Sequence, residues 1–204
     1  MGEYTNTTRH ILRETHSLLK SHGYRKKKKI FNRSLDSKLI HVIQFQLGRR
    51  SLYGKLTINL GVFIPEIHKL IWDRDMPKFA DYGDCEIVKR IGELLSPPED
   101  LWLDLGTKED ELVMNAVELL KLYGLPYLDQ FLSNDDIIRK WQDDGEDIGL
   151  PARAGLSIAI LLANQGHLEQ AENLLKQEYI RKKGEPYAGF VINIADKLGI
   201  GFST

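Results

Sequence analysis

Polar side chains that could bind another molecule alternate with apolar ones in two neighbouring stretches, KLIHVIQFQL at 38–47 and GKLTINLGVFI at 54–64. The alternation predicts two half-buried β-strands joined by the basic loop GRRSLY, because successive side chains of a strand point to opposite faces. Amide and guanidinium groups gathered on one face could hold a carboxylate or a phosphate, since arginine offers a planar pair of donors. The residues that we expect on this face, some of them from flanking strands, are Arg33, Gln44, Gln46, Thr57, Asn59 and Arg90.

The polar face has two interpretations. An antiparallel sheet commonly packs one face on the core and exposes the other to water, so these side chains could simply be solvated. Alternatively they form a recognition surface, and Gly61 beside them would let a backbone or a ligand approach closely. The opposite face, which we expect in the core, carries Leu39, Ile43, Phe45, Leu47, Leu56, Ile58, Leu60, Val62 and Ile64.

A catalytic centre is not indicated by any motif. The sequence has no GxSxG, GxxxxGK[ST], HExxH or GxGxxG, and His10, His16 and His22 lie six residues apart, which spreads them around a helix. His41 fits better as a hydrogen-bonded core histidine than as a ligand, and Cys85 as a small core hydrophobe than as a nucleophile. We expect no catalytic residue, metal or cofactor, with a hydrolase or transferase site between sheet and helices as an alternative.

A basic run, Arg25–Lys29, follows the first predicted helix. Together with Arg49 and Arg50 it could contact phosphates, which makes a nucleic-acid-associated factor an alternative function. The plainer interpretation is a solvated helix exit, because cations favour a helix C-terminus and lysines are common on edge strands. No aromatic residues are interleaved with the run, and the net charge of the chain is -1, so we favour the plainer interpretation.

Composition limits the class of protein. With 204 residues, 42% of them hydrophobic and 28% charged, the chain is typical of a folded protein with a sizeable core. The single cysteine excludes an internal disulfide and suits a reducing compartment. The N-terminus lacks the apolar segment of a signal peptide, and the longest apolar run, GLSIAILLA, is too short to span a bilayer. We therefore expect a cytoplasmic protein with no membrane segment.

The elements around the two strands predict an α+β fold. Residues 7–22 have the apolar face of a helix that ends at Gly23, and RKKKKIFNRSL reads as a strand whose ordered part begins near Lys29. Pro65 is well placed to begin a short helix, and CEIVKRIGEL at 85–94 reads as a further strand. We expect an N-terminal helix and a mainly antiparallel four-stranded sheet.

From Thr107 onward every periodic segment is helical. Apolar residues recur at helical spacing up to Tyr123, and Gly124 is expected to end that helix. Further helices are predicted near 133–141, 151–164 and 168–179, with a last one whose inward residues run from Phe190 to Leu198. This region is expected to form an all-helical cap, so that residues 1–106 and 107–204 pack as one structural unit.

Several of these segments together resemble a known family. The series LLKSHGYRKKKKIFNR, VIQFQ, TINLGVF, CEIVKRIGEL and EDLW is similar to the bacterial domain-of-unknown-function family numbered 4304. The resemblance extends to about Leu105, with YGLPYL as a continuation. Family members often have a second aromatic residue after the tryptophan, whereas here Leu103 follows Trp102. The resemblance implies a fold and a bacterial origin and no particular reaction.

These observations favour a non-enzymatic binding protein of the bacterial cytoplasm. A small α+β chain without a catalytic motif and with a polar sheet face could mask another protein, as immunity proteins and antitoxins do. The expected partner is therefore a protein rather than a nucleic acid or a membrane.

Overall fold

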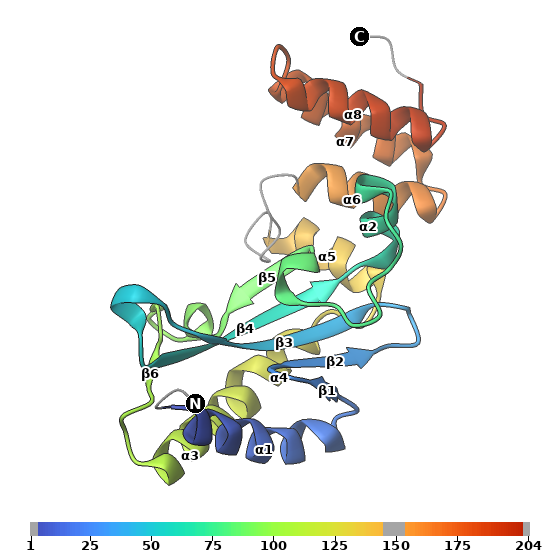
Figure 1. The fold of residues 1–204 in the computed structure, drawn as a ribbon. Helices are drawn as coiled ribbons and strands as arrows, with labels where there is room; N and C mark the ends of the chain where they lie inside the picture. The colour runs from blue at the N-terminus through green and yellow to red at the C-terminus, as the bar shows by residue number, and fades with distance from the viewer. Residues whose placement is uncertain (1–3, 145–153, 202–204) are drawn as a thin grey trace. The chain divides into compact units, whose positions relative to one another are not determined.

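The computed structural model describes residues 4–144 and 154–201, which form two compact units. The first unit comprises the described residues up to Phe63 together with Lys78–Ser133. The second comprises Ile64–Pro77 and the described residues from Asn134 onward. Helices and an antiparallel sheet are combined as the sequence predicts, so the α+β class is confirmed (Figure 1).

A six-stranded antiparallel sheet is the centre of the first unit. Five strands follow one another in the order β1–β2–β3–β4–β5, and β6 pairs with the start of β4. The prediction of four strands is wrong because β1 has three residues and β6 has two, too few for an alternating pattern to show in the sequence. The strands are β1 (Arg25–Lys27), β2 (Ile30–Ser34), β3 (Ile40–Leu47), β4 (Lys55–Phe63), β5 (Ile87–Arg90) and β6 (Leu103–Asp104).

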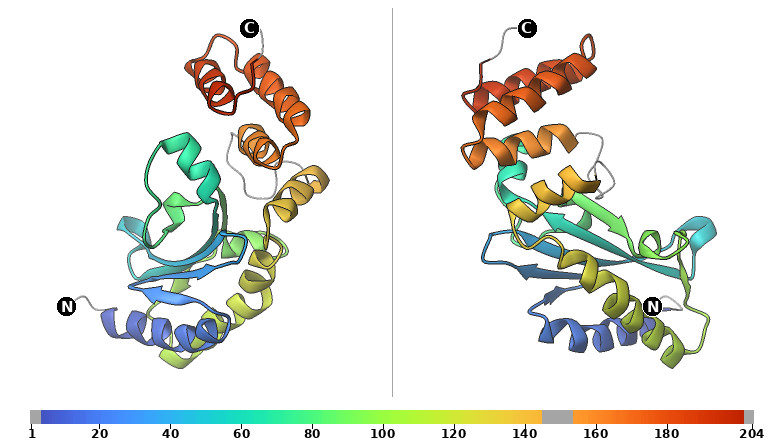
Figure 2. Two further views of the ribbon diagram at one scale, coloured as in Figure 1. Left: turned by 90° about the vertical axis from the view of Figure 1, so that its right-hand side faces the viewer. Right: turned by 180° about the vertical axis from the view of Figure 1, so that it is seen from behind.

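The predicted core face of the sheet is confirmed. The register pairs Ile43 with Leu60 and Phe45 with Ile58, and all four side chains are fully buried. These apolar residues are therefore shielded from water by neighbouring elements. The helices on this side of the sheet are α1 (Thr5–Ser21), α3 (Glu109–Leu119) and α4 (Leu125–Leu128) (Figures 1 and 2).

Among the glycines that the sequence predicts to end helices, Gly23 does so and Gly124 does not. Gly23 ends α1: its φ of +83° lies in the left-handed region, and the N–H of Tyr24 donates to the carbonyl of Leu19 at 3.0 Å. The expectation for Gly124 is wrong, because its backbone is right-handed and the helix continues into α4. The link is a π-helical turn, η4 (Leu120–Gly124). Its backbone hydrogen bonds join residues five positions apart instead of four.

The other face of the sheet carries a second, smaller core. Val42, Phe63 and Ala80 are fully buried there, and Cys85 packs against them. Ala80 and Cys85 come from the loop before β5, which contains a short 3-10 helix, η2 (Tyr82–Asp84). The loop before β5 therefore covers this part of the face and shields it from water.

In the second unit a helix from the middle of the chain joins helices from its end. Pro65 begins that helix, α2, as predicted. Lys197 Nζ donates to the carbonyl of Leu70 at 3.1 Å, and Asn134 Nδ2 donates to Glu66 Oε2 at 2.9 Å. The helices of this unit are α2 (Pro65–Trp72), α5 (Asn134–Asp144), α6 (Ala154–Asn164), α7 (Leu168–Arg181) and α8 (Pro186–Lys197).

Further expectations concern the helices. The expected helix start at Pro151 lies outside the described residues, and α8 begins at Pro186, before its expected inward residues from Phe190 on. Within residues 4–144 and 154–201, no helix is both long enough and apolar enough to cross a bilayer. That the helices after Thr107 and the sheet form one structural unit stays a prediction.

Candidate functional site

The strand register brings five of the six expected polar residues to one face. Gln44 of β3 pairs with Asn59 of β4, and Gln46 pairs with Thr57. On its other side Asn59 pairs with Arg90 of β5. Directly paired residues of an antiparallel sheet point to the same side, so these five side chains are neighbours. They lie on the face with the second core, opposite α1.

Arg33 is on the other face, which corrects its expected place. It pairs in register with His41, whereas the residue before it, Asn32, pairs with Val42 on the polar face. A shift of one residue along a strand moves a side chain to the opposite side. The Nη1 group of Arg33 donates to Asp129 Oδ1 at 2.8 Å, so it ties β2 to the end of α4.

The amides on the polar face hold loops in place. Thr57 and Asn59 are each 1% exposed, so this is not the solvated face that one interpretation of the sequence assumes. Asn59 Nδ2 donates to Gln46 Oε1 at 2.7 Å, and the N–H of Tyr82 donates to Gln44 Oε1 at 2.9 Å. The hydroxyl of Thr57 donates to a carbonyl in the loop before β6 at 2.9 Å. Partner binding by these residues stays a prediction.

Of the five residues on the polar face, Arg90 is the one that carries a charge. Its guanidinium lies 5.3 Å from the centroid of the Trp102 ring and donates to the carboxylate of Asp100. That hydrogen bond lowers the pKa of Asp100 below its usual range. The arginine is thus occupied by its own chain on two sides, by an aromatic face and by a carboxylate.

Gly61 leaves room for the side chain of Cys85, from the same chain, to pack on the sheet. A Cβ at this position would lie 2.5 Å from the Sγ of Cys85, so only glycine allows that cysteine to pack on the sheet. The thiol donates to the carbonyl of Asp81 at 3.3 Å, and burial raises the pKa of Cys85 well above its usual value. A thiol held in its protonated form is a poor nucleophile, which fits the expected core role.

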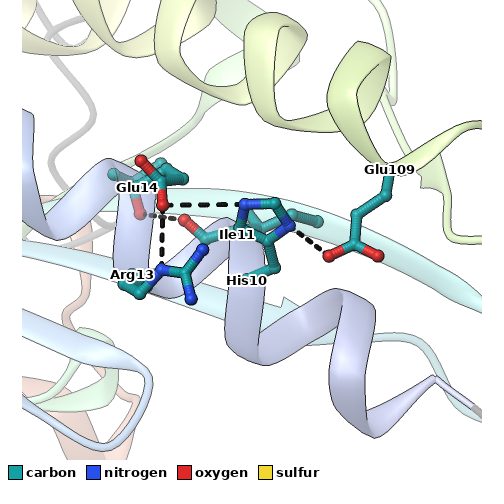
Figure 3. Close-up of polar contacts among 6 residues, drawn as sticks. His10, Ile11, Arg13, Glu14 and Glu109 are labelled. Carbon is teal, nitrogen blue, oxygen red and sulfur yellow. Dashed lines mark hydrogen bonds and ion pairs between the residues drawn. The ribbon is translucent and has the colours of Figure 1, made fainter.

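His10 is the histidine with the closest carboxylates (Figure 3). Its Nδ1 contacts Glu109 at the start of α3, and its Nε2 lies 3.6 Å from Glu14 on α1. A general base needs one ring nitrogen free to take a proton from a substrate. Because both nitrogens of His10 face carboxylates, its evident role is to fasten α1 to α3.

A pocket lies in the first unit between three segments that are distant in sequence: the first half of α1, the β1–β2 hairpin and the β3–β4 connection. Its volume of about 680 Å³ is in the range of ligand-binding sites. Of the described residues that line it, five are cationic and none is a carboxylate. We call it the basic pocket, and its cations are Arg9, Lys26, Lys28, Lys29 and Lys55.

Apolar and aromatic groups complete the basic pocket. Leu12 and Leu105 are buried residues of its lining. The rings of Tyr4 and Tyr53 meet edge to face with their centroids 5.8 Å apart, and Tyr53 is 65% exposed. Gly54, at φ +80°, gives the Tyr4 ring its room, because a Cβ there would lie 3.2 Å from it. The chemical complement of such a site is a ligand with an apolar part and several negative charges.

Two local features of the basic pocket are unusual. Thr8 is 7% exposed, and its hydroxyl has no hydrogen-bond partner among the described residues, although buried hydroxyls are nearly always paired. Lys28, at the tip of the β1–β2 hairpin, has a φ of +56°, a conformation uncommon for residues other than glycine. Strained backbone is concentrated at functional sites, and a buried hydroxyl without a partner is rare enough to need an explanation.

The buried histidine is a core residue, as the sequence indicates. His41 is fully buried, and its Nε2 lies 2.8 Å from the carbonyl oxygen of Phe131, to which the N–H form of the ring donates. Burial lowers the pKa of His41 below 6.5. Among the described residues no group of three or more His, Cys, Asp or Glu side chains could hold a metal ion.

The buried histidine makes stability depend on pH. In the unfolded chain His41 takes up a proton near pH 6.5, while in the folded protein it does so at lower pH, so acidification favours unfolding. Below pH 6.5 we expect the free energy of unfolding to fall by up to about 1.4 kcal/mol per pH unit from this one group, until the folded pKa is passed. Urea unfolding between pH 8 and 5 measures the effect. His41→Gln should lose less stability over that range, and an equal loss in both proteins would contradict the assignment.

Comparison with known proteins places the chain in a family. Residues 15–130 match the family described as Domain of unknown function (DUF4304). The match covers more than half of the 204 residues, and the chain belongs to this family. The matched segment holds all six strands and four of the five cations of the basic pocket, while Arg9 precedes it. No match was found among curated proteins or among solved structures.

Proposed function

We propose that this chain is a non-enzymatic binding protein that holds an acidic, partly apolar segment of another protein in the basic pocket. The observation that supports the proposal is the lining of that pocket, which has five cations, buried leucines and no carboxylate among its described residues. Negative side chains of a partner would meet unopposed positive charge at the rim, and its apolar side chains would displace water from the floor.

The composition of the pocket also favours binding over catalysis. Its described lining contains no histidine, aspartate or glutamate, the side chains that most often serve as general bases, and no cysteine or serine nucleophile. A protein that only holds its partner needs none of them. We therefore propose that the chain masks a partner in the bacterial cytoplasm, as immunity proteins and antitoxins do.

A nucleic-acid-associated factor is the second candidate. Its support is that Lys26, Lys28 and Lys29 line the same pocket as Tyr4 and Tyr53, so cations and aromatic rings occur together there. Three observations favour a protein partner instead. The two tyrosine rings contact each other, the floor of the pocket is made of leucine side chains that cannot stack on bases, and the net charge is -1.

Fluorescence anisotropy with a labelled peptide that alternates Asp or Glu with Leu or Phe tests the proposal. The double variant Lys26→Glu/Lys29→Glu should bind at least about tenfold more weakly than wild type, because two attractions become repulsions at a partly shielded site. Affinity of wild type should also fall as salt is raised. The matched control is Lys38→Glu/Lys121→Glu, the same charge change at two exposed lysines outside the pocket, which should bind within about twofold of wild type.

The same titration with a single-stranded oligonucleotide separates the two candidates. Tighter binding of the oligonucleotide than of the acidic peptide, with a steep decrease in salt and the same loss in the pocket variant, would replace the protein partner by nucleic acid. If the control variant weakens the peptide as much as the pocket variant, binding is only an effect of overall charge and the proposal fails.

A further inference from the structure

A second hollow in the first unit has the opposite charge. It lies between the end of α3 with the turn η4 and the loop that leads into β6, and its volume is about 330 Å³. We call it the acidic groove. Its apolar lining consists of Leu95, Leu101, Leu103, Leu119, Leu122 and Tyr123.

Part of this apolar lining lies exposed on the π-helical turn. Along α3 the buried residues follow one another at four-residue steps, from Leu112 through Ala116 to Leu120. The next buried positions are Gly124, which ends the π turn, and Leu125, which begins α4. Leu122 is left 57% exposed, and Tyr123, which the regular helical spacing predicts to be in the core, is only half-buried. Such turns are frequently found at functional sites.

The charged residues of the groove are all of one sign. Glu99 and Glu118 belong to its lining, and no lysine or arginine does among the described residues. Neither carboxylate forms an ion pair within the described part of the chain, so both can meet a cation from outside. An exposed apolar surface with a polar rim is typical of an interaction site.

From these observations we infer that the acidic groove binds a basic amphipathic segment of a partner protein. The segment would place one or two apolar side chains against Leu122 and Tyr123 and direct lysine or arginine groups to Glu99 and Glu118. This site is separate from the basic pocket, shares no lining residue with it and has the opposite preference for charge. It would let the protein hold a partner by two contacts, or hold two partners at once.

Titration of the full chain with a labelled helical peptide that carries leucines one turn apart and flanking lysines tests this site. Leu122→Ala should weaken binding at least about fivefold, since an exposed leucine contributes at an interface and little to folding. Glu99→Gln/Glu118→Gln should weaken it about tenfold and make the affinity less dependent on salt. The matched controls are Met114→Ala and Glu111→Gln on the same helix, outside the groove, which should leave the affinity within about twofold.

Three results would overturn the inference. Wild type could bind the basic peptide no better than a peptide with the same leucines and no lysines, or the groove variants could bind it like wild type. The chain could also sediment as a dimer that Leu122→Ala dissociates, in which case the groove is covered by a second copy. The pocket variant Lys26→Glu/Lys29→Glu should bind this peptide normally, so failure of the basic pocket and failure of the groove are told apart.

Discussion

Replacing Ile58 with alanine is expected to lower the free energy of unfolding by about 2–5 kcal/mol, a large part of the stability of a small domain. Ile58 is fully buried on β4 and pairs in register with Phe45 of β3. Removing its branched side chain leaves a cavity between the sheet and the helices, and close-packed neighbours collapse into such a space only in part. Urea unfolding followed by circular dichroism measures the loss.

Met114→Ala is the control for this measurement. Met114 also lies in the first unit but is 63% exposed, so its truncation should change the free energy of unfolding by no more than about 0.5 kcal/mol. An Ile58→Ala protein that unfolds at the same urea concentration as wild type would show that the core face of β4 has been assigned to the wrong side.

Replacing Gly61 with alanine is expected to cost about 1–3 kcal/mol, although the change adds only a methyl group. The new Cβ would lie 2.5 Å from the Sγ and 2.8 Å from the Cβ of Cys85, distances at which one of the two segments must move. Backbone N–H groups of the loop before β5 donate to the side-chain oxygens of Asn32 and Gln44, so the loop cannot shift without losing these hydrogen bonds. Thermal and urea unfolding report the cost.

Two variants separate this close contact from a general effect of glycine. Gly189→Ala makes the same substitution inside α8, where a Cβ meets nothing within 4 Å, and should stabilise the protein by about 0.4–1 kcal/mol. In a Cys85→Gly background the cost of Gly61→Ala should nearly vanish. An unchanged cost in that background would mean that Cys85 is not the obstacle.

The periodic part of the fold could be predicted from the sequence. β3 and β4 are long, and apolar residues recur at every second position along them, so the sequence predicts their core face correctly. β1 and β6 were missed because strands of three and two residues form only through their pairing partners. Arg33 was assigned to the wrong face because nothing in the sequence fixes the register of β2 against β3.

The candidate sites were harder to predict than the strands. The run Arg25–Lys29 is visible by its charge, but only the folded chain brings it beside Tyr4 and Tyr53. At Gly124 the sequence alone cannot distinguish two uses of glycine. A glycine can end a helix, or it can let a helix approach another segment closely. Gly124 has the second use, since a Cβ there would lie 3.3 Å from the side chain of Ile91.

The membership of α2 in the second unit affects how the protein can be made and cut. The chain leaves the first unit after Phe63, returns at Lys78 and leaves it again after Ser133, so three peptide connections join the units instead of one. During synthesis α2 is made long before α6 and α8, the helices on which it packs. Its apolar face therefore stays exposed to water until those helices have been made. A single proteolytic cut between α4 and α5 would leave the two units still covalently joined, and no truncation at one site yields either unit by itself.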